Sequence, residues 1–300
     1  MKQFIDLLKD VMTNGIDKPD RTSVGQSRAV FGRQLRFDLT EGFPIITTRR
    51  VPFRIAFEET MFFLRGETNT KLLEEKKINI WKGNTSREFL NNRQLYHLEE
   101  GDMGKGYGYQ WRHWESPVVD YDVTDEIGGR KLVYEIGHTD QIAELLTGLK
   151  QDPYGRRHVV TGWNPGQLHE MALPPCHMLH MYSVAPDKKL NSSFVMRSND
   201  VPYGLPFNIM GYALLNHIFA KHLGLTPGEL VYMGWDVHIY ANQFEMVEEQ
   251  LKRDVRPLPL LNIKKDLATI DDIMNLQWED IELIGYDPHP DIANKPDMAI

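Results

Sequence analysis

The chain has 300 residues, of which 41% are hydrophobic and 25% are charged, and this composition supports a sizeable buried core. Its net charge of -8 argues against a broad groove that tracks nucleic-acid phosphates, so we expect no stable nucleic-acid complex and only a small nucleotide partner. The single cysteine excludes an internal disulfide framework and a metal site built from several thiolates.

No apolar run reaches the roughly eighteen residues that a transmembrane helix needs, and the N-terminus opens directly into amphipathic sequence. We therefore expect a cytoplasmic protein with no membrane partner.

The hydrophobic pattern switches between helical and strand-like periods along the chain. The predicted elements, in chain order, are a helix at 1–15, strand-like runs at 27–39 and 42–48, helices at 55–64 and 140–149, short strands at 158–163, 178–184 and 191–196, and an almost wholly apolar helix at 209–223. The stretches 85–106 and 115–140 are polar and contain glycine, which is typical of surface insertions. The pattern therefore predicts one α+β domain over residues 1–300.

Cys176 is the first candidate for chemistry. A lone cysteine is by default a small buried hydrophobe. Here two prolines precede it, which stiffens the backbone and removes two N–H donors, and His177 follows directly. A reactive thiol needs positive charge nearby to hold its thiolate, and Arg156, Arg157 and Arg197 flank this segment in the sequence. Cys176 is therefore a candidate nucleophile.

The run Leu173-Pro174-Pro175-Cys176-His177 resembles the thymidylate synthase family, and the likeness extends over nearly the whole chain. The other motifs that carry it are Asp20-Arg21-Thr22, Gly42-Phe43-Pro44, 64–69, Ile80-Trp81, 107–112, Arg156-Arg157, 197–200, 204–209, 236–240 and 285–290.

The resemblance implies a large mixed or antiparallel sheet packed with helices, and a homodimer in which two sheets face each other. It also implies a one-carbon transfer to C5 of dUMP, with 5,10-methylenetetrahydrofolate as the co-substrate and no metal. Cys176 would add to C6 of the uracil, which makes C5 nucleophilic.

The family pattern assigns the phosphate of dUMP to arginines. Arg21, Arg197 and Ser198 resemble the ligands from the same subunit, whereas Arg156 and Arg157 resemble the pair that reaches the partner's site in the dimer. Guanidinium groups suit phosphate and also favour a thiolate. The alternative for Arg156 and Arg157 is a solvated surface pair.

Asn208 matches the residue that reads the pyrimidine edge, because its amide offers an acceptor and a donor to N3–H and the C4 carbonyl of uracil. Related deoxycytidylate enzymes have an aspartate there, so uracil is favoured over cytosine. The alternative is that Asn208 caps the following helix. His238 and Tyr240 alternate along a predicted strand and resemble the pair that holds the sugar 3′-hydroxyl; a structural role for His238 is the alternative.

For proton transfer, Glu59 resembles the family's base, assisted by Tyr107 and His177, while neighbouring Glu58 is expected to be a solvated charge. Folate contacts are implied for four residues. These are Asp200, Trp81, Asn84 and the C-terminal Ile300. Core packing is the alternative for Trp81.

Four departures from the usual synthase pattern bear on the product: Lys82, Lys105, Val195 and Met196. The stretch 196–201 is similar to phage deoxycytidylate hydroxymethylases. We therefore hypothesise a deoxyuridylate hydroxymethyltransferase that makes 5-hydroxymethyl-dUMP for phage DNA modification, acting in the host cytoplasm. The alternative is a thymidylate synthase that makes dTMP and dihydrofolate, and a third hypothesis is a non-catalytic nucleotide- or RNA-binding homologue.

Overall fold

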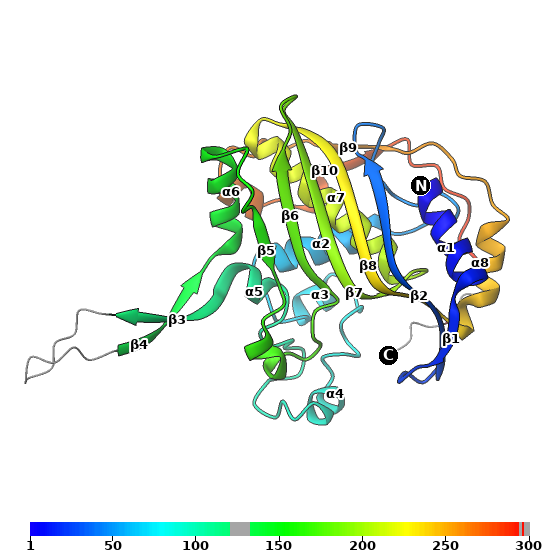
Figure 1. Ribbon diagram of the computed structural model, residues 1–300, viewed down its shortest axis with the longest axis horizontal. Helices are drawn as coiled ribbons and strands as arrows, with labels where there is room; N and C mark the ends of the chain where they lie inside the picture. The colour runs from blue at the N-terminus through cyan, green and yellow to red at the C-terminus, as the bar shows by residue number, and fades with distance from the viewer. Residues whose placement is uncertain (121–132, 294–295, 297–300) are drawn as a thin grey trace, which may run out of the picture.

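A computed structural model describes residues 1–120, 133–293 and 296 of the chain. Figure 1 shows its elements, which are, in chain order, α1 (Lys2–Asn14), β1 (Ile16–Pro19), β2 (Gln26–Asp38), α2 (Phe53–Leu64), α3 (Lys71–Glu75), α4 (Arg87–Asn92), α5 (Gly108–His113), β3 (Trp114–Asp120), β4 (Val133–Thr139), α6 (Gln141–Gln151), β5 (Val159–Thr161), η1 (Pro165–Glu170), β6 (His177–Val184), β7 (Lys189–Asp200), α7 (Gly204–Leu223), β8 (Thr226–Tyr240), η2 (Ala241–Gln243), α8 (Phe244–Leu251), β9 (Leu260–Ile263), α9 (Ile270–Met274), η3 (Trp278–Asp280) and β10 (Ile281–Ile284).

The largest sheet has six strands in the order β1-β2-β8-β7-β6-β5. Strands β7 and β8 are parallel, and the other neighbouring pairs are antiparallel. Two separate two-stranded sheets, β3/β4 and β9/β10, complete the described strands. The prediction of one α+β domain with a large mixed sheet is confirmed.

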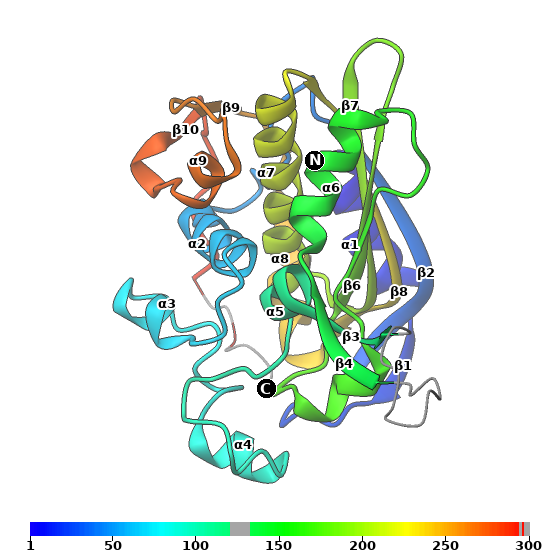
Figure 2. The same ribbon diagram turned by 90° about the vertical axis from the view of Figure 1, so that its left-hand side faces the viewer.

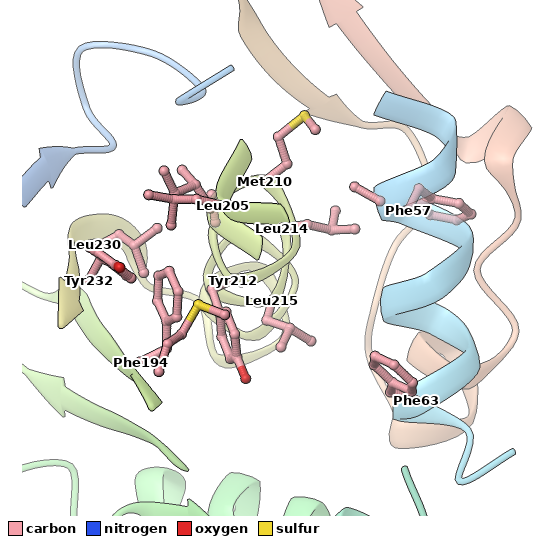
Figure 3. Close-up of a cluster of buried hydrophobic side chains, with 14 of the residues drawn as sticks. Phe57, Phe63, Phe194, Leu205, Met210, Tyr212, Leu214, Leu215, Leu230 and Tyr232 are labelled. Atoms are coloured by element: carbon pink, nitrogen blue, oxygen red, sulfur yellow. The ribbon is translucent and has the colours of Figure 1, made fainter. Parts of the chain in front are cut away.

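Helix α7 occupies the centre of the molecule, between the sheet and α2 (Figure 2). It is apolar around most of its circumference, and such a helix is stable only when it is enclosed. On the sheet side, the ring of Tyr212 stacks on Phe194 with centroids 4.3 Å apart. On the other side, Leu214 points toward α2 and its Phe57 (Figure 3). The core is therefore continuous from the sheet through α7 to α2.

The opposite face of the sheet, toward the viewer in Figure 1, has no helix over it. Large apolar side chains are exposed there: Phe31 is 79%, Met181 41%, Met233 36% and Trp235 40% exposed. Several large apolar side chains exposed on one uncovered face are typical of an interaction face.

The helices predicted at 1–15, 55–64, 140–149 and 209–223 are confirmed, as are strands at 27–39, 158–163, 178–184 and 191–196, with ends that shift by a few residues. The strand at 42–48 is wrong. Its buried Phe43, Ile45 and Ile46 give a strand-like pattern, but Pro44 lacks an N–H, and Phe43 N–H donates to the Pro259 carbonyl at 2.7 Å instead of to a neighbouring strand.

The described parts of 115–140 form the β3/β4 hairpin, which extends away from the body of the molecule (Figure 1). This agrees with the prediction of a surface insertion. Within residues 1–120, 133–293 and 296, no helix combines the length and hydropathy that crossing a bilayer requires.

The central position of α7 can be tested with a matched pair of truncations. Leu214→Ala removes a fully buried side chain and should lower the free energy of unfolding by about 2–5 kcal/mol, because it leaves a cavity. Leu260→Ala, at a position 58% exposed, should cost less than about 1 kcal/mol. Urea unfolding followed by circular dichroism measures both, and equal losses would contradict the arrangement.

Candidate active site

Cys176 lies directly before β6 and is fixed through Arg197 on the adjacent strand β7. Arg197 Nε and Nη2 donate to the carbonyls of Pro175 and Pro174 at 2.9 and 2.8 Å. The backbone N–H of Arg197 also donates to the Cys176 carbonyl at 2.9 Å. These bonds leave Nη2 3.9 Å from the Cys176 sulfur. The guanidinium is therefore oriented by backbone groups beside the thiol.

Tyr107 is the second neighbour of Cys176. Its hydroxyl oxygen accepts the Cys176 backbone N–H at 2.9 Å, and its ring stacks on Phe63 of α2 with centroids 4.7 Å apart. Tyr107 has a positive φ of 36°, which is rare for a residue with a side chain. Burial raises its pKa well above 10.0, so the phenol is protonated at neutral pH.

Burial also raises the pKa of the Cys176 thiol, while Arg197, Tyr107 and Arg21 act in the opposite direction. The predicted arginine support is thus present from Arg197 and Arg21, but burial has the larger effect. The thiol is protonated at neutral pH in this structure.

A cavity of about 290 Å³ opens beside the thiol and gathers eight of the predicted residues. These are Arg21, Asn84, Cys176, Arg197, Ser198, Asp200, His238 and Tyr240. Lys18, Arg21 and Arg197 bring positive charge to its wall, and Asp20, Asp200 and Asp236 bring acidic groups. Lys18 is paired with Asp236, so the two arginines are the groups suited to a small anion. The cavity joins residues from β1, β2, β7 and β8 and the segment before β6, so the sheet assembles positions that lie far apart in the sequence.

His238 is held by an acid that the sequence analysis did not single out. Asp236, two positions earlier on β8, lies 3.0 Å from His238 Nδ1 and is also ion-paired with Lys18. Hydrogen bonds from His238 and Lys18 lower the pKa of Asp236 to about 2. Because a carboxylate only accepts, the proton of this hydrogen bond belongs to Nδ1. Within the described residues, the buried Nε2 has no partner, so it is available to a ligand.

The two-residue spacing of Asp236 and His238 on one strand was the signal that would have identified this acid, because such residues share a face.

A second cavity, of about 240 Å³, adjoins the first and shares Asn84 and Gly204 with it. Its lining also includes Ile55, Glu59, Ile80, Trp81, Tyr203, Phe207 and Asn208. The wall is mostly apolar and aromatic, which suits a flat ring system. Asp200 lines the first cavity. Gln243 Nε2 donates to its carboxylate at 3.1 Å, and burial raises the pKa of this carboxyl.

Glu59 lies on α2 and faces this second cavity. Trp81 Nε1 donates to Glu59 Oε1 at 2.8 Å. Burial raises the pKa of Glu59 to about 7, and the Trp81 hydrogen bond moderates that rise. A pKa near neutrality suits a group that accepts and returns protons. Trp81 is also buried among core residues. It therefore both packs in the core, as the alternative supposed, and binds Glu59.

His177 and Asn208 meet Glu59 around a further space of about 20 Å³, which is large enough for one water molecule. Burial lowers the pKa of His177 to about 3, so its ring is neutral, and Nδ1 lies 2.7 Å from the Tyr212 hydroxyl. Asn208 is in the first turns of α7, whose N-cap is Tyr203. The alternative that Asn208 caps the helix is therefore wrong.

One further expectation is wrong, and those for Arg156, Arg157 and Ile300 stay predictions. Glu58 is 5% exposed and bound to Lys76 Nζ at 2.6 Å, so the expectation of a solvated charge is wrong; α2 is buried around most of its surface. Arg156 and Arg157 are exposed and line a separate cavity of about 970 Å³ beside α6 and β5, away from Cys176. Ile300 lies outside the described residues.

Among residues 1–120, 133–293 and 296, no cluster of three His, Cys, Asp or Glu side chains has the arrangement of a metal site.

A half-buried thiol beside a cavity with two arginines, next to an aromatic cavity with a carboxyl whose pKa is near neutrality, is the arrangement of a nucleophilic group-transfer site. The sequence matches the thymidylate synthase family over residues 2–299, and the chain belongs to that family.

Two similar proteins are the bifunctional dihydrofolate reductase-thymidylate synthases of Paramecium tetraurelia and Zea mays. They are 41% and 40% identical to this chain over 298 residues, which is 99% of the chain in both cases. The chain spans 61% and 54% of the lengths of these two relatives.

The raised pKa of Glu59 has a consequence for stability. Between its ordinary value of 4.5 and about 7, the folded protein keeps a proton that the unfolded chain has lost, so stability falls as pH rises through this window. Relative to Glu59→Gln, the wild type should lose up to about 3 kcal/mol of unfolding free energy. Urea unfolding at several pH values measures this difference.

The exposed Glu248→Gln is the control and should change the free energy of unfolding by less than about 0.5 kcal/mol. Trp81→Phe should extend the window upward, because it removes the hydrogen bond that lowers the Glu59 pKa. A pH-independent difference between the wild type and Glu59→Gln would contradict the assignment.

Proposed function

We propose that this chain is a thymidylate synthase, which converts dUMP to dTMP with methylenetetrahydrofolate as the co-substrate. The observation that carries the proposal is the pair of adjoining cavities. One holds Cys176 with Arg21 and Arg197, and the other is aromatic and apolar, with Glu59 at its wall. A nucleotide and a folate bound in these two cavities would meet at Asn84 and Gly204, which line both.

Arg21, Arg197 and Ser198 would hold the phosphate of dUMP in the first cavity. Cys176 would then lose its thiol proton to solvent in the cavity and add as the thiolate to C6 of the uracil, and the electron pair of the C5–C6 double bond would pass to the C4 carbonyl oxygen. Asn208, at the boundary with the second cavity, would bind N3–H and that oxygen. A bound phosphate would partly offset the guanidinium charges that favour the Cys176 thiolate. Phosphate binding would therefore oppose ionisation of the thiol, and the two are coupled.

His238 and Tyr240 would bind the sugar 3′-hydroxyl. Their rings are 5.0 Å apart on β8, and His238 Nε2 is the unpartnered buried atom in this wall. Since Asp236 keeps the proton on Nδ1, a neutral ring presents Nε2 as an acceptor for a hydroxyl donor.

The second cavity fits a folate because its walls are aromatic and the buried Asp200 carboxyl lies close by. When bound, methylenetetrahydrofolate supplies both the one-carbon unit and the hydride. Trp81 and Phe207 would stack against its rings, and Asn84 and Asp200 would bind its polar edge. Glu59, with neutral His177 and a water in the small space between them, would move the proton lost from C5.

The hydroxymethyltransferase hypothesis loses support because the four residues that depart from the synthase pattern lie outside both cavities. Lys82 is 66% exposed and pairs with Glu74, and Met196 is buried in the core. None of Lys82, Lys105, Val195 and Met196 lines either cavity as the described residues form it. The apolar wall beside Trp81 disfavours water at the transferred carbon, and both similar proteins carry thymidylate synthase in their names.

The uncovered sheet face supports a homodimer as part of this proposal. Its exposed apolar side chains, Phe31, Met181, Met233 and Trp235, would be buried between two facing sheets. Arg156 and Arg157 are exposed and separate from the Cys176 cavity, which is compatible with a role in the partner's site.

Product analysis tests the proposal directly. The protein is incubated with dUMP and methylenetetrahydrofolate, and the nucleotide and the folate are both identified by mass spectrometry. We expect dTMP with dihydrofolate, and loss of turnover by at least about 1,000-fold in Cys176→Ser, because the nucleophile is removed. 5-Hydroxymethyl-dUMP with tetrahydrofolate would instead support the hydroxymethyltransferase. If the wild type binds dUMP but does not turn it over, the result would support a non-catalytic homologue.

The role of Asn208 can be tested by base preference. Asn208→Asp replaces an amide donor by an acceptor, which suits the amino group of cytosine, so the ratio of kcat/KM for dUMP to that for dCMP should fall by about 100-fold or more. Asn84→Asp is the matched control, because Asn84 lines both cavities but is not assigned to the base; its ratio should not change. An unchanged ratio in Asn208→Asp would contradict the assignment.

A further inference from the structure

Lys105 departs from the family pattern, yet it lies outside both cavities. Its ammonium contacts Glu115 Oε2 at 2.8 Å and Glu170 Oε2 at 2.9 Å. Glu115 is on β3 and Glu170 ends η1, so one side chain connects three segments of the chain. The Lys105 side chain is 26% exposed and its partners are 14% and 30% exposed, which shields these ion pairs better than typical surface pairs.

Both ends of Lys105 are fixed. Gln110 Nε2 donates to its carbonyl at 2.8 Å and also to Gln167 Oε1 at 2.8 Å, while Gln167 Nε2 donates to Glu115 Oε2 at 2.6 Å. The hydrogen bonds therefore form a closed circuit around Lys105. Burial acts to lower the pKa of Lys105, but Glu115 and Glu170 outweigh it and raise the pKa to about 12. The clamp thus persists across the physiological pH range.

This clamp joins the segment that carries Tyr107 to the segment that leads to Cys176. Lys105 N–H donates to the Glu170 carbonyl at 3.3 Å, and Ala172 N–H donates to the Met103 carbonyl at 3.0 Å. A Cβ at Gly104 would lie 2.1 Å from the Glu170 carbonyl oxygen, so the two backbones approach as closely as glycine permits.

Tyr107, two residues after Lys105, has a backbone conformation that its surroundings must impose. A positive φ at a non-glycine residue costs about 1–3 kcal/mol and persists only where neighbouring contacts determine it. Phe63 fixes the ring, and the Cys176 N–H binds the hydroxyl. The contacts of Lys105 fix the backbone that enters this turn.

We propose that Lys105 is a positioning residue, which holds the Tyr107 hydroxyl against Cys176 by clamping residues 104–108 to the 170–176 segment through Glu170 and to β3 through Glu115. The kinetic part of this inference rests on the proposed function. The effect on Cys176 does not, because it can be measured without turnover.

Cys176 is the single cysteine, so the rate of its alkylation by iodoacetamide, followed by intact mass against pH, reports this one thiol. Tyr107 lowers the pKa of Cys176, and its displacement should move the alkylation midpoint to higher pH. We expect this shift in Lys105→Met and in Tyr107→Phe, a smaller shift in Lys105→Arg, and no shift in Lys189→Met, which breaks an exposed ion pair with Asp187.

The double variant Lys105→Met/Tyr107→Phe distinguishes positioning from general destabilisation. If Lys105 acts through Tyr107, the double variant should match Tyr107→Phe alone. In turnover assays, Lys105→Met should lower kcat about ten- to a hundred-fold while the KM for dUMP changes less than about twofold, because the displaced Tyr107 hydroxyl binds the backbone of the nucleophilic residue. Lys105→Arg should recover most of this loss.

The proposal would be overturned if Lys105→Met had the alkylation profile and kcat of the wild type. It would also be overturned if the effects of Lys105→Met and Tyr107→Phe were additive in the double variant. Should circular dichroism show that Lys105→Met does not fold, Glu115→Gln removes one of the two ion pairs of Lys105 with little change of shape, and its alkylation profile and kcat decide by the same criteria, with smaller effects expected. Absence of turnover in the wild type would reject the proposed function, and the alkylation profiles would still decide the role of Lys105.

Discussion

Helix α7 has apolar side chains on nearly every side, and enclosing it dictates where the other parts of the site lie. The sheet packs on one side and brings Cys176, Arg197 and His238 to the ends of adjacent strands. Helix α2 packs on the other side and brings Glu59. Asn208 projects from α7 itself, between the two. A change that loosened α7 would therefore separate the nucleophile from the base.

Burial favours the uncharged form of the ionisable groups at the centre of the site. It keeps Cys176 and Glu59 more protonated than they would be in water, and it keeps His177 neutral. Of the charges that remain, Asp236 is paired with Lys18 and hydrogen-bonded to His238, and Glu58 is paired with Lys76. Arg197, whose side chain binds backbone carbonyls, is left to meet an anion.

Periodicity predicted α1, α2, α6 and α7 because each has a regular apolar face or is wholly apolar. The family resemblance predicted which residues share the Cys176 cavity, although Arg197 and Pro175 are 22 residues apart. Side-chain partners were not predictable in this way. Nothing in the sequence pairs Lys105 with Glu170, and the burial of Glu58 depends on segments that pack over α2. Gly42–Thr48 looked like a strand because burial and strand pairing give similar patterns.

The protonated state of Cys176 also affects how the protein withstands oxidants. Thiolates, not thiols, react with peroxides, and the chain has no second cysteine that could trap a sulfenic acid as an intramolecular disulfide. An oxidised Cys176 would depend on an external thiol for repair. By keeping the sulfur as a thiol in a confined cavity, burial limits this damage while no ligand is bound, so the same desolvation that restrains the nucleophile also lengthens its working life.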